Sequence, residues 1–432
     1  MRARVRPAEK IEPSQTGNPA ITGKEYFPAL DGLRGVAVLI VMLAHGSVRL
    51  FPGYLTYRGG WLGVEIFFVL SGFLITGLLL KERLKSGRIS LTSFWKRRTL
   101  RIWPLYYAVL LLYVFVLPQF DSSLFARVYV SEGEPGWEQY RSALWSFFVF
   151  LQNYVAVTSE AHLGLGIFWS LAIEEHFYLF WPLLVTFLKP RYIGPAAVGV
   201  LVVSFGCRAL AMFGVLPSFD GLGHMTHENL DAIALGSLVA CVYAMRREWV
   251  VSASRYSYVL LGPVLVVIAG LFADGWNGMP VSLSPPLFGL YKPTLVAFAV
   301  GALIVVLVGR QIQATATDDG VGEDRKSRRR AAAARKRVSR PLGRLLESRL
   351  MVHIGRVSFG LYLLHPILLG ATTALARNTT GPWGHIESFP ALLGARSLWT
   401  TVFLGGTLGL ASLSYRYYEG PMLRLKKRFE RV

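Results

Sequence analysis

The sequence predicts an all-α fold: a polytopic membrane helix bundle of about ten transmembrane helices plus a short re-entrant or interfacial helix. Hydrophobic residues make up 53% of the 432 residues, and an aromatic fraction of 13% suits interfacial belts of Trp and Tyr. The mean hydropathy is +0.42, which is typical of a membrane protein. The basic residues cluster between apolar stretches, so the net charge of +20 follows the positive-inside rule and requires no nucleic-acid partner.

The first predicted span, residues 26–50, carries Asp31, Arg34 and His45 within an apolar run. A charged group at membrane depth costs on the order of 2.5–3.5 kcal/mol, so these residues must be paired or must face a cavity inside the bundle. Arg34 and His45 share one helical face and lie roughly 16 Å apart along the axis, and Asp31, three residues before Arg34, lies on the same face. The alternative is polar side chains that only hold neighbouring helices together.

Nine further spans are predicted over residues 61–80, 102–117, 164–188, 192–213, 228–245, 258–272, 287–308, 353–375 and 397–418. Residues 143–154 are apolar but too short to cross about 30 Å of hydrocarbon, which predicts the re-entrant or interfacial helix. With ten spans every basic loop falls on one side, and both termini are cytoplasmic. The polar N-terminal tail has no apolar stretch, so the first span is expected to act as a signal anchor.

The predicted organisation consists of a membrane domain interrupted by one basic loop. Its parts are an N-terminal cytoplasmic tail (1–25), spans one to eight (26–310), a basic cytoplasmic loop (311–350), spans nine and ten (351–420), and a basic C-terminal tail (421–432). The low-complexity stretch 311–340 cannot bury an apolar face and is expected to be disordered in part. It is interpreted as a solvated loop or as a contact with anionic lipid headgroups.

His45 and Glu65 are predicted to lie at the same depth near the outer membrane surface. The first span runs outward and the second runs back, which places each about 6–8 Å below its outer end at about 1.5 Å per residue. A carboxylate beside an imidazole fixes the tautomer and supports an imidazolium, as a general base requires. The alternative is a hydrogen-bonded pair that merely joins two helices.

Arg98 and Arg101 are predicted to face the same way at the cytoplasmic start of the third span. Arginine suits bidentate recognition of phosphate, although ordinary flanking charge is the alternative interpretation. Lys96 and Arg97 are interpreted as flanking charges only.

Glu174 is predicted near mid-membrane, on a helical face that it shares with Ser170 and Tyr178. A carboxylate at that depth needs a partner, and His365 and Asp231 are placed similarly in the ninth and sixth spans. No soluble catalytic motif accompanies these residues. No metal site is predicted.

In this order the motifs resemble the acyltransferase 3 family of integral-membrane O-acyltransferases. They are Leu-Asp-Gly-Leu-Arg-Gly at 30–35 followed by His45, the stretch around Glu65, Arg98-x-x-Arg101, the stretch around Glu174, and the stretches around His365 and Glu419. The resemblance covers residues 26–425 except the insert at 311–340. One departure is the absence of an arginine that often precedes the equivalent of Asp231.

The resemblance implies an enzyme that moves an acyl group, most simply acetyl, from cytoplasmic acyl-CoA to a hydroxyl on the extracytoplasmic side. Acyl-CoA would be a co-substrate and not a bound cofactor, and the acceptor would be a sugar, polysaccharide, lipid-linked or small molecule. It also implies a bacterial inner (plasma) membrane location. The expected catalytic residues are His45, as base or transient acyl carrier, Glu65 and Glu174. The expected substrate-binding residues are Asp31, Arg34, Arg98, Arg101, Tyr178 and His365.

Two alternatives remain open at this point. The same buried charges could line the path of a transporter or flippase of a lipid-linked saccharide, or they could only fix the packing of a structural bundle. Binding of CoA separates the first alternative from the enzyme.

Overall fold

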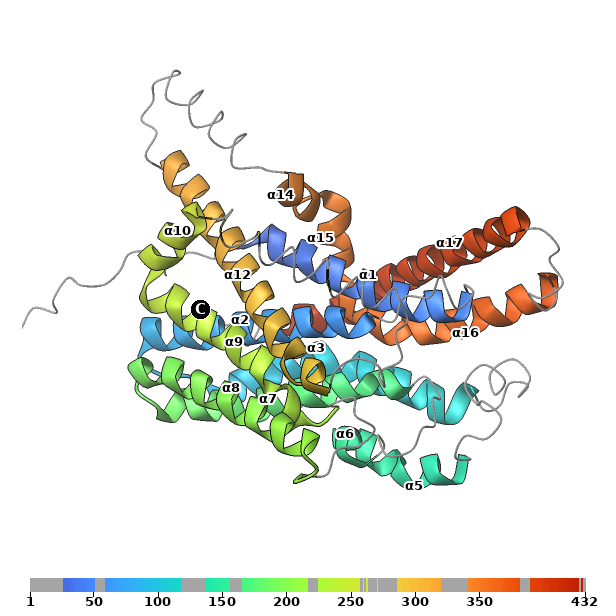
Figure 1. Ribbon diagram of the computed structural model, residues 1–432, viewed down its shortest axis with the longest axis horizontal. Helices are drawn as coiled ribbons and strands as arrows, with labels where there is room; N and C mark the ends of the chain where they lie inside the picture. The colour runs from blue at the N-terminus through green and yellow to red at the C-terminus, as the bar shows by residue number, and fades with distance from the viewer. Residues whose placement is uncertain are drawn as a thin grey trace, which may run out of the picture.

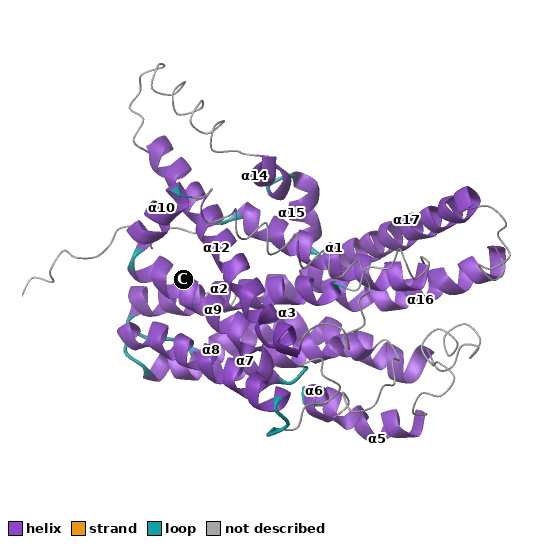
Figure 2. Cartoon of the chain, in the orientation of Figure 1, coloured by secondary structure: helices purple, strands orange, loops and turns teal. Residues whose placement is uncertain are grey.

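The computed structural model describes residues 26–50, 59–117, 137–155, 165–216, 224–256, 286–319, 341–380 and 389–426, with single residues 259, 262, 270 and 429. Over these ranges every regular element is helical and no strand occurs (Figure 2). The helices that form the bundle are α1 (Pro28–Leu50), α2 (Gly60–Ser86), α3 (Leu91–Leu111), α7 (Phe168–Phe187), α8 (Pro190–Met212), α9 (Thr226–Met245), α12 (Pro286–Asp319), α16 (Ser358–Thr380) and α17 (Phe389–Ser414) (Figure 1). The shorter elements are η3 (Leu112–Val116), α5 (Trp137–Phe148), α6 (Gln152–Val155), η5 (Leu165–Ile167), α10 (Arg247–Arg255), α14 (Pro341–Leu346), α15 (Arg349–Arg356), η7 (Tyr415–Glu419) and α18 (Gly420–Lys426).

The predicted all-α membrane bundle is confirmed, although the number of spans is not fixed at ten. Seven of the described helices are long and apolar enough to cross a membrane: α1, α2, α3 with η3, α8, α9, α12 and α16. Helices α7 and α17 have comparable lengths of 20 and 26 residues. The predicted span at 258–272 lies outside the described ranges.

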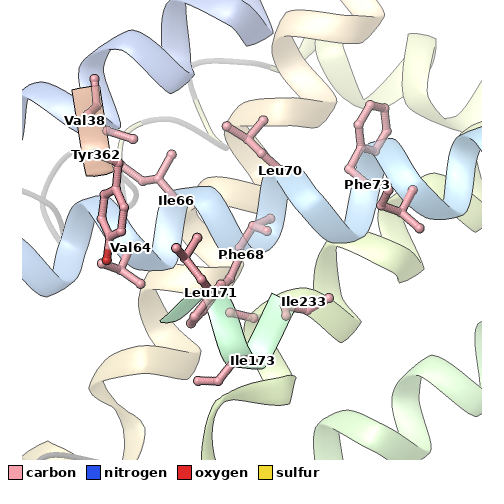
Figure 3. Close-up of a cluster of buried hydrophobic side chains, with 14 of the residues drawn as sticks. Val38, Val64, Ile66, Phe68, Leu70, Phe73, Leu171, Ile173, Ile233 and Tyr362 are labelled. Atoms are coloured by element: carbon pink, nitrogen blue, oxygen red, sulfur yellow. The ribbon is translucent and has the colours of Figure 1, made fainter. Parts of the chain in front are cut away.

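Helix α2 lies at the centre of the bundle, and most of its residues are buried. It packs against α1, α7, α9 and α12. Figure 3 shows side chains of α2, among them Phe68 and Leu70, close to Leu171 of α7 and Ile233 of α9. Because four other helices pack against it, α2 serves as the axis around which these spans are placed.

Glycines allow the backbones of α2 and α9 to touch. A Cβ on Gly72 would lie 1.9 Å from the carbonyl oxygen of Ile233, and one on Gly236 would lie 2.0 Å from that of Val69. Small residues at helix crossings are the usual means of close packing in membranes, where apolar surface alone supplies little driving force. The crossing of α2 and α9 therefore depends on these two glycines.

The glycines of the Leu-Asp-Gly-Leu-Arg-Gly segment serve a second close contact, between α1 and the short helices α14 and α15. A Cβ on Gly32 would lie 1.9 Å from the Leu346 carbonyl oxygen, and one on Gly355 would lie 1.7 Å from that of Asp31. The segment is therefore a packing surface as well as a source of charged side chains.

A buried ion pair joins α8, α9 and α12. The Arg208 guanidinium donates to both carboxylate oxygens of Asp231, at 3.1 and 2.7 Å, and to the Glu228 carbonyl at 2.7 Å. The Thr294 hydroxyl lies 2.6 Å from Asp231 Oδ2. This pair accounts for the intramembrane Asp231, whose charge is compensated from another helix.

Several boundaries differ from those predicted; α3 begins at Leu91 and α17 at Phe389, each earlier than the predicted span. The predicted ninth span is divided at Val357 into α15 and α16, and α12 extends past residue 308 to Asp319. The extension is held by polar side chains, since Gln311 donates to the Tyr26 carbonyl at 2.6 Å and Gln313 donates to the Val251 carbonyl at 2.9 Å. The predicted short helix at 143–154 is present as α5 and α6, joined at Phe150.

Replacing Gly72 by alanine is expected to destabilise the folded protein by about 1–3 kcal/mol or more, because the new methyl group forces α2 away from α9. Gly77→Ala, in the same helix, is the matched control, because a methyl group at Gly77 would meet nothing within 4 Å. Thermal unfolding of the purified protein in detergent measures the difference. Equal unfolding temperatures for the two variants would contradict the close crossing.

Candidate active site

His45 on α1 and His365 on α16 form a directly contacting pair of imidazoles. His45 Nδ1 lies 3.2 Å from His365 Nε2, and the ring centroids are 5.0 Å apart. His365 is fully buried, whereas His45 is exposed on the protein surface. The buried imidazole of His365 therefore contacts and orients the exposed imidazole of His45.

Backbone carbonyls determine where the protons of the neutral pair lie. His365 Nδ1 is 2.8 Å from the Tyr362 carbonyl oxygen, and because a carbonyl only accepts, this nitrogen carries the proton and leaves Nε2 as an acceptor. His45 Nδ1 faces the Val41 carbonyl at 3.0 Å as well as His365 Nε2, so it donates to both. The lone pair of neutral His45 is thereby assigned to Nε2.

Glu65 does not supply the hydrogen bond to His45 that the sequence suggests. Its carboxylate is buried on α2, and Oε2 has no hydrogen-bond partner among the described residues. The charges that act on it belong to Asp231 and Arg208. The prediction rested on equal depth in the membrane, which does not determine which side of α2 faces α1.

Three arginines converge on Glu174 of α7. Arg34 of α1 and Arg98 and Arg101 of α3 all act electrostatically on the Glu174 carboxylate. The carboxylate itself accepts a 2.9 Å hydrogen bond from the Tyr178 hydroxyl, which lies 2.6 Å from Ser71 Oγ. The sequence prediction that Glu174 and Tyr178 share one face, and that Arg98 and Arg101 do so, is consistent with this arrangement.

Two of these arginines each have one buried donor without a protein partner among the described residues. Nε of Arg34 and Nε of Arg98 are buried and have no hydrogen-bond partner in the described part of the chain. The Arg98 guanidinium lies over the rings of Phe94 and Tyr178, at 5.7 Å from each centroid. Arginine guanidinium groups are chemically suited to recognise carboxylates and phosphates.

Asp31 makes its hydrogen bond and its ion pair with residues other than Arg34, although its charge also acts on Arg34. It accepts a 2.8 Å hydrogen bond from the Tyr26 hydroxyl and forms a 3.9 Å ion pair with Arg356 of α15. The hydrogen bond from Arg356 to Tyr26, at 3.0 Å, raises the pKa of Arg356. This placement favours a role for Asp31 in holding α15 against α1; its predicted contact with substrate stays a prediction.

The interpretation of Arg97 as a flanking charge is wrong. Its side chain is buried, forms a 3.3 Å ion pair with Glu82 of α2, and donates to the Phe429 carbonyl at 2.7 Å. Arg97 therefore fixes the start of α3 against α2, while Arg98 and Arg101 on the same helix face Glu174.

Sequence reasoning missed two functional relationships. The first is Arg208, the partner of Asp231; its signal is that it is the only charged residue within the apolar part of α8. The second is the His45–His365 contact, for which a histidine within each of two spans is the only signal. The described residues contain no group of three or more His, Cys, Asp or Glu side chains that could hold a metal ion.

The fold and these clusters define a polytopic membrane bundle that carries an imidazole pair and a cluster of arginines near Glu174. The family model described as an acyltransferase domain, Acyl_transf_3, matches residues 27–416. The chain therefore belongs to the acyltransferase 3 family, and it is an integral membrane protein.

Curated relatives come from Staphylococcus aureus. The O-acetyltransferase OatA of strains NCTC 8325 / PS 47 and COL is 35% identical over 234 residues, which is 50% of this chain and 35% of the relative. The protein SACOL0978 of strain COL is 36% identical over 232 residues, with the same shares covered. The similarity thus spans about a third of the length of these relatives. No solved structure matches the chain.

Proposed function

We propose that the protein is a membrane O-acyltransferase that moves an acyl group, most simply acetyl, from acyl-CoA to a hydroxyl of a sugar or related acceptor. The observation that carries the proposal is the orientation of His45. Its Nδ1–H is directed at the Val41 carbonyl and at His365 Nε2, which puts the lone pair of the neutral ring on Nε2. The family membership and the acetyltransferase names of the relatives support the reaction class.

The neutral His45 ring suits either of two routes. As a general base, Nε2 takes the proton of the acceptor hydroxyl while the acceptor oxygen attacks the thioester carbonyl; the C–S bond breaks, and the CoA thiolate receives the proton. As a nucleophile, Nε2 attacks the carbonyl first and releases the CoA thiolate; the acceptor hydroxyl then attacks the cationic acyl-imidazole, the C–N bond breaks, and the hydroxyl proton passes by way of the imidazole to the CoA thiolate. In both routes the imidazole becomes cationic, and the hydrogen bond to His365 Nε2 becomes charge-assisted and stronger.

The arginine cluster suits the phosphates of the acyl donor. Arg34 and His45 lie on the same helix, roughly 16 Å apart along its axis. Phosphates held at Arg34, Arg98 and Arg101 would thus leave the extended pantetheine arm to reach toward His45. Glu174 and Tyr178 would orient the guanidinium groups, a positioning role that differs from the catalytic role predicted for Glu174.

The proposed sidedness places the arginine cluster, both termini and the 311–340 segment in the cytoplasm of a bacterium, with the protein in its inner membrane. The one-sided distribution of Lys and Arg supports it. The acceptor would then be acylated at the opposite end of α1, on the extracytoplasmic side.

His45→Ala is expected to lower kcat for acyl transfer by about 100-fold or more, as the loss of a general base or nucleophile does. CoA affinity should stay within about twofold, because the arginine cluster is distant. His365→Phe should cost about 10–100-fold, the equivalent of a charge-assisted hydrogen bond, and His365→Gln should restore part of the rate because its carbonyl can accept from His45. Transfer at the wild-type rate by folded His45→Ala would refute the assignment.

Arg98→Ala and Arg101→Ala are each expected to weaken CoA binding by about tenfold or more, and Arg98→Lys should recover little because it lacks the planar fork. Lys96→Ala is the matched control, since it removes the same charge from an exposed position on the same helix. Calorimetric titration of the purified protein with CoA, at low and high salt, gives the affinities. Failure of the wild type to bind CoA would favour the flippase alternative.

The sidedness is tested by labelling. In a Cys207→Ser, Cys241→Ser background, a cysteine introduced by Ser327→Cys should be protected from a membrane-impermeant thiol reagent in intact cells and should react after permeabilisation. Labelling in intact cells would place the 311–340 segment outside and reverse the topology.

A further inference from the structure

Helix α16 contains a proline, Pro366, inside the helix and directly after His365. In an α-helix each backbone N–H donates to the carbonyl four residues earlier, and the nitrogen of proline carries no hydrogen. The residue four positions before Pro366 is Tyr362. The Tyr362 carbonyl therefore does not receive the hydrogen bond that a regular helix would give it from residue 366, and the proline ring also pushes this carbonyl out of line with the helix.

The side chain of His365 supplies a donor to this same carbonyl. His365 Nδ1 lies 2.8 Å from the Tyr362 carbonyl oxygen. Residues Tyr362, His365 and Pro366 are all buried, and a buried carbonyl without a donor is unfavourable. The proline thus gives the imidazole of its neighbour a backbone acceptor that is not shared with an N–H from the next helical turn.

The carbonyl that faces His45 differs in this respect. Val41 O lies 3.0 Å from His45 Nδ1, but α1 is one continuous helix from Pro28 to Leu50, and residue 41 receives its regular backbone hydrogen bond from residue 45. His45 Nδ1 is therefore a second donor to a carbonyl that is already engaged. Of the two carbonyls that contact the imidazole pair, that of Tyr362 is the stronger acceptor for a ring proton.

The neutral pair has two proton arrangements that keep the hydrogen bond between the rings. In the first, His45 Nδ1–H donates to His365 Nε2, and His365 Nδ1–H donates to the Tyr362 carbonyl. In the second, His365 Nε2–H donates to His45 Nδ1, and neither carbonyl receives a ring proton. The second arrangement places the His45 proton on Nε2, where no lone pair is then available. The strength of the Tyr362 carbonyl as an acceptor favours the first arrangement.

Helix α7 has a proline with the same relation to a side-chain donor. Pro182 lies inside α7, and the carbonyl four residues earlier is that of Tyr178. This carbonyl accepts a 3.0 Å hydrogen bond from Trp95 Nε1 of α3. The hydroxyl of Tyr178 donates to Glu174, and the Arg98 guanidinium lies over the Tyr178 ring. A proline therefore opens a backbone acceptor beside each of the two clusters, and a side chain donates to it in both helices.

We propose that Pro366 is a positioning residue for the imidazole pair. By withholding a backbone N–H from the Tyr362 carbonyl, it directs that carbonyl to His365 Nδ1 and thereby places the lone pair of neutral His45 on Nε2. The consequence for acyl transfer rests on the proposed function, whereas the assignment of the two ring protons does not.

The test compares two variants at position 366 that differ in one hydrogen. Pro366→Ala restores the backbone N–H. The second variant carries lactic acid in place of alanine at position 366, introduced by nonsense suppression in a cell-free system with lipid nanodiscs; this backbone ester has no N–H, as in proline. Both lose the packing of the proline ring. Pro195→Ala, at an exposed position inside α8, is the control for adding an N–H to another helix.

The tautomers are measured by ¹⁵N solid-state NMR of labelled histidines in the full-length wild type, Pro366→Ala and Pro195→Ala. We expect a population of Pro366→Ala with His45 and His365 protonated on Nε2, and none in the wild type or Pro195→Ala. In Pro366→Ala, kcat for transfer should fall about fivefold, the equivalent of one hydrogen bond, with CoA affinity within about twofold of the wild type. The ester should recover most of the rate.

Wild-type tautomers in Pro366→Ala, or an equal loss of rate in the alanine and ester variants, would overturn the proposal, because the proline would then act through its ring alone. A shift of tautomers in Pro366→Ala, together with a wild type that transfers no acyl group, would refute the proposed function and leave the role of Pro366 intact.

Discussion

The cost of an uncompensated charge inside an apolar bundle governs this structure. Several buried charges are paired directly. Arg208 forms an ion pair with Asp231, and Arg97 forms one with Glu82. Against that background, Arg34 and Arg98 differ from Arg97 and Arg208 because neither forms an ion pair with a carboxylate among the described residues. The phosphates of the proposed acyl donor would supply the compensating negative charge.

The same constraint distinguishes the residues that stabilise the fold from the residues proposed to bind substrate. Glycine contacts fix α2 against α9 and α1 against α15, and the Arg208–Asp231 pair ties α8 and α12 to α9. The histidines and arginines are thereby held on rigid helices, which orient side chains more precisely than loops do. One end of α1 then carries Arg34 and the other carries His45, so a single helix spans the proposed donor site and reaction site.

Much of this arrangement could be predicted from helical spacing alone. Arg34 and His45 do lie on one helix, Arg98 and Arg101 do face the same cluster, and Glu174 does contact Tyr178. Spacing along one helix could not identify partners on other helices. The contact between His45 and His365 joins residues 320 positions apart, and the Arg97–Glu82 pair depends on how α3 turns back on α2.

The unpartnered acceptors at Gln152, Asn153 and Glu175 could not be predicted from the sequence either. Gln and Asn are ordinary in a short interfacial segment, so these residue types do not indicate a buried oxygen without a donor. Only the burial of each oxygen, with its partner nitrogen or oxygen already engaged, distinguishes them.

The central claim is that His45 presents an unprotonated Nε2 because His365 and a backbone carbonyl hold its Nδ1–H. Solid-state NMR of the full-length protein in bilayers, with all eight histidines labelled with ¹⁵N and the two signals assigned by His45→Gln and His365→Gln, reads the tautomers directly. Both rings should carry their proton on Nδ1 when neutral, and the His45 Nδ1–H should show coupling to His365 Nε2. A neutral His45 protonated on Nε2 would contradict the account, because neither the base nor the acyl carrier could then operate as described.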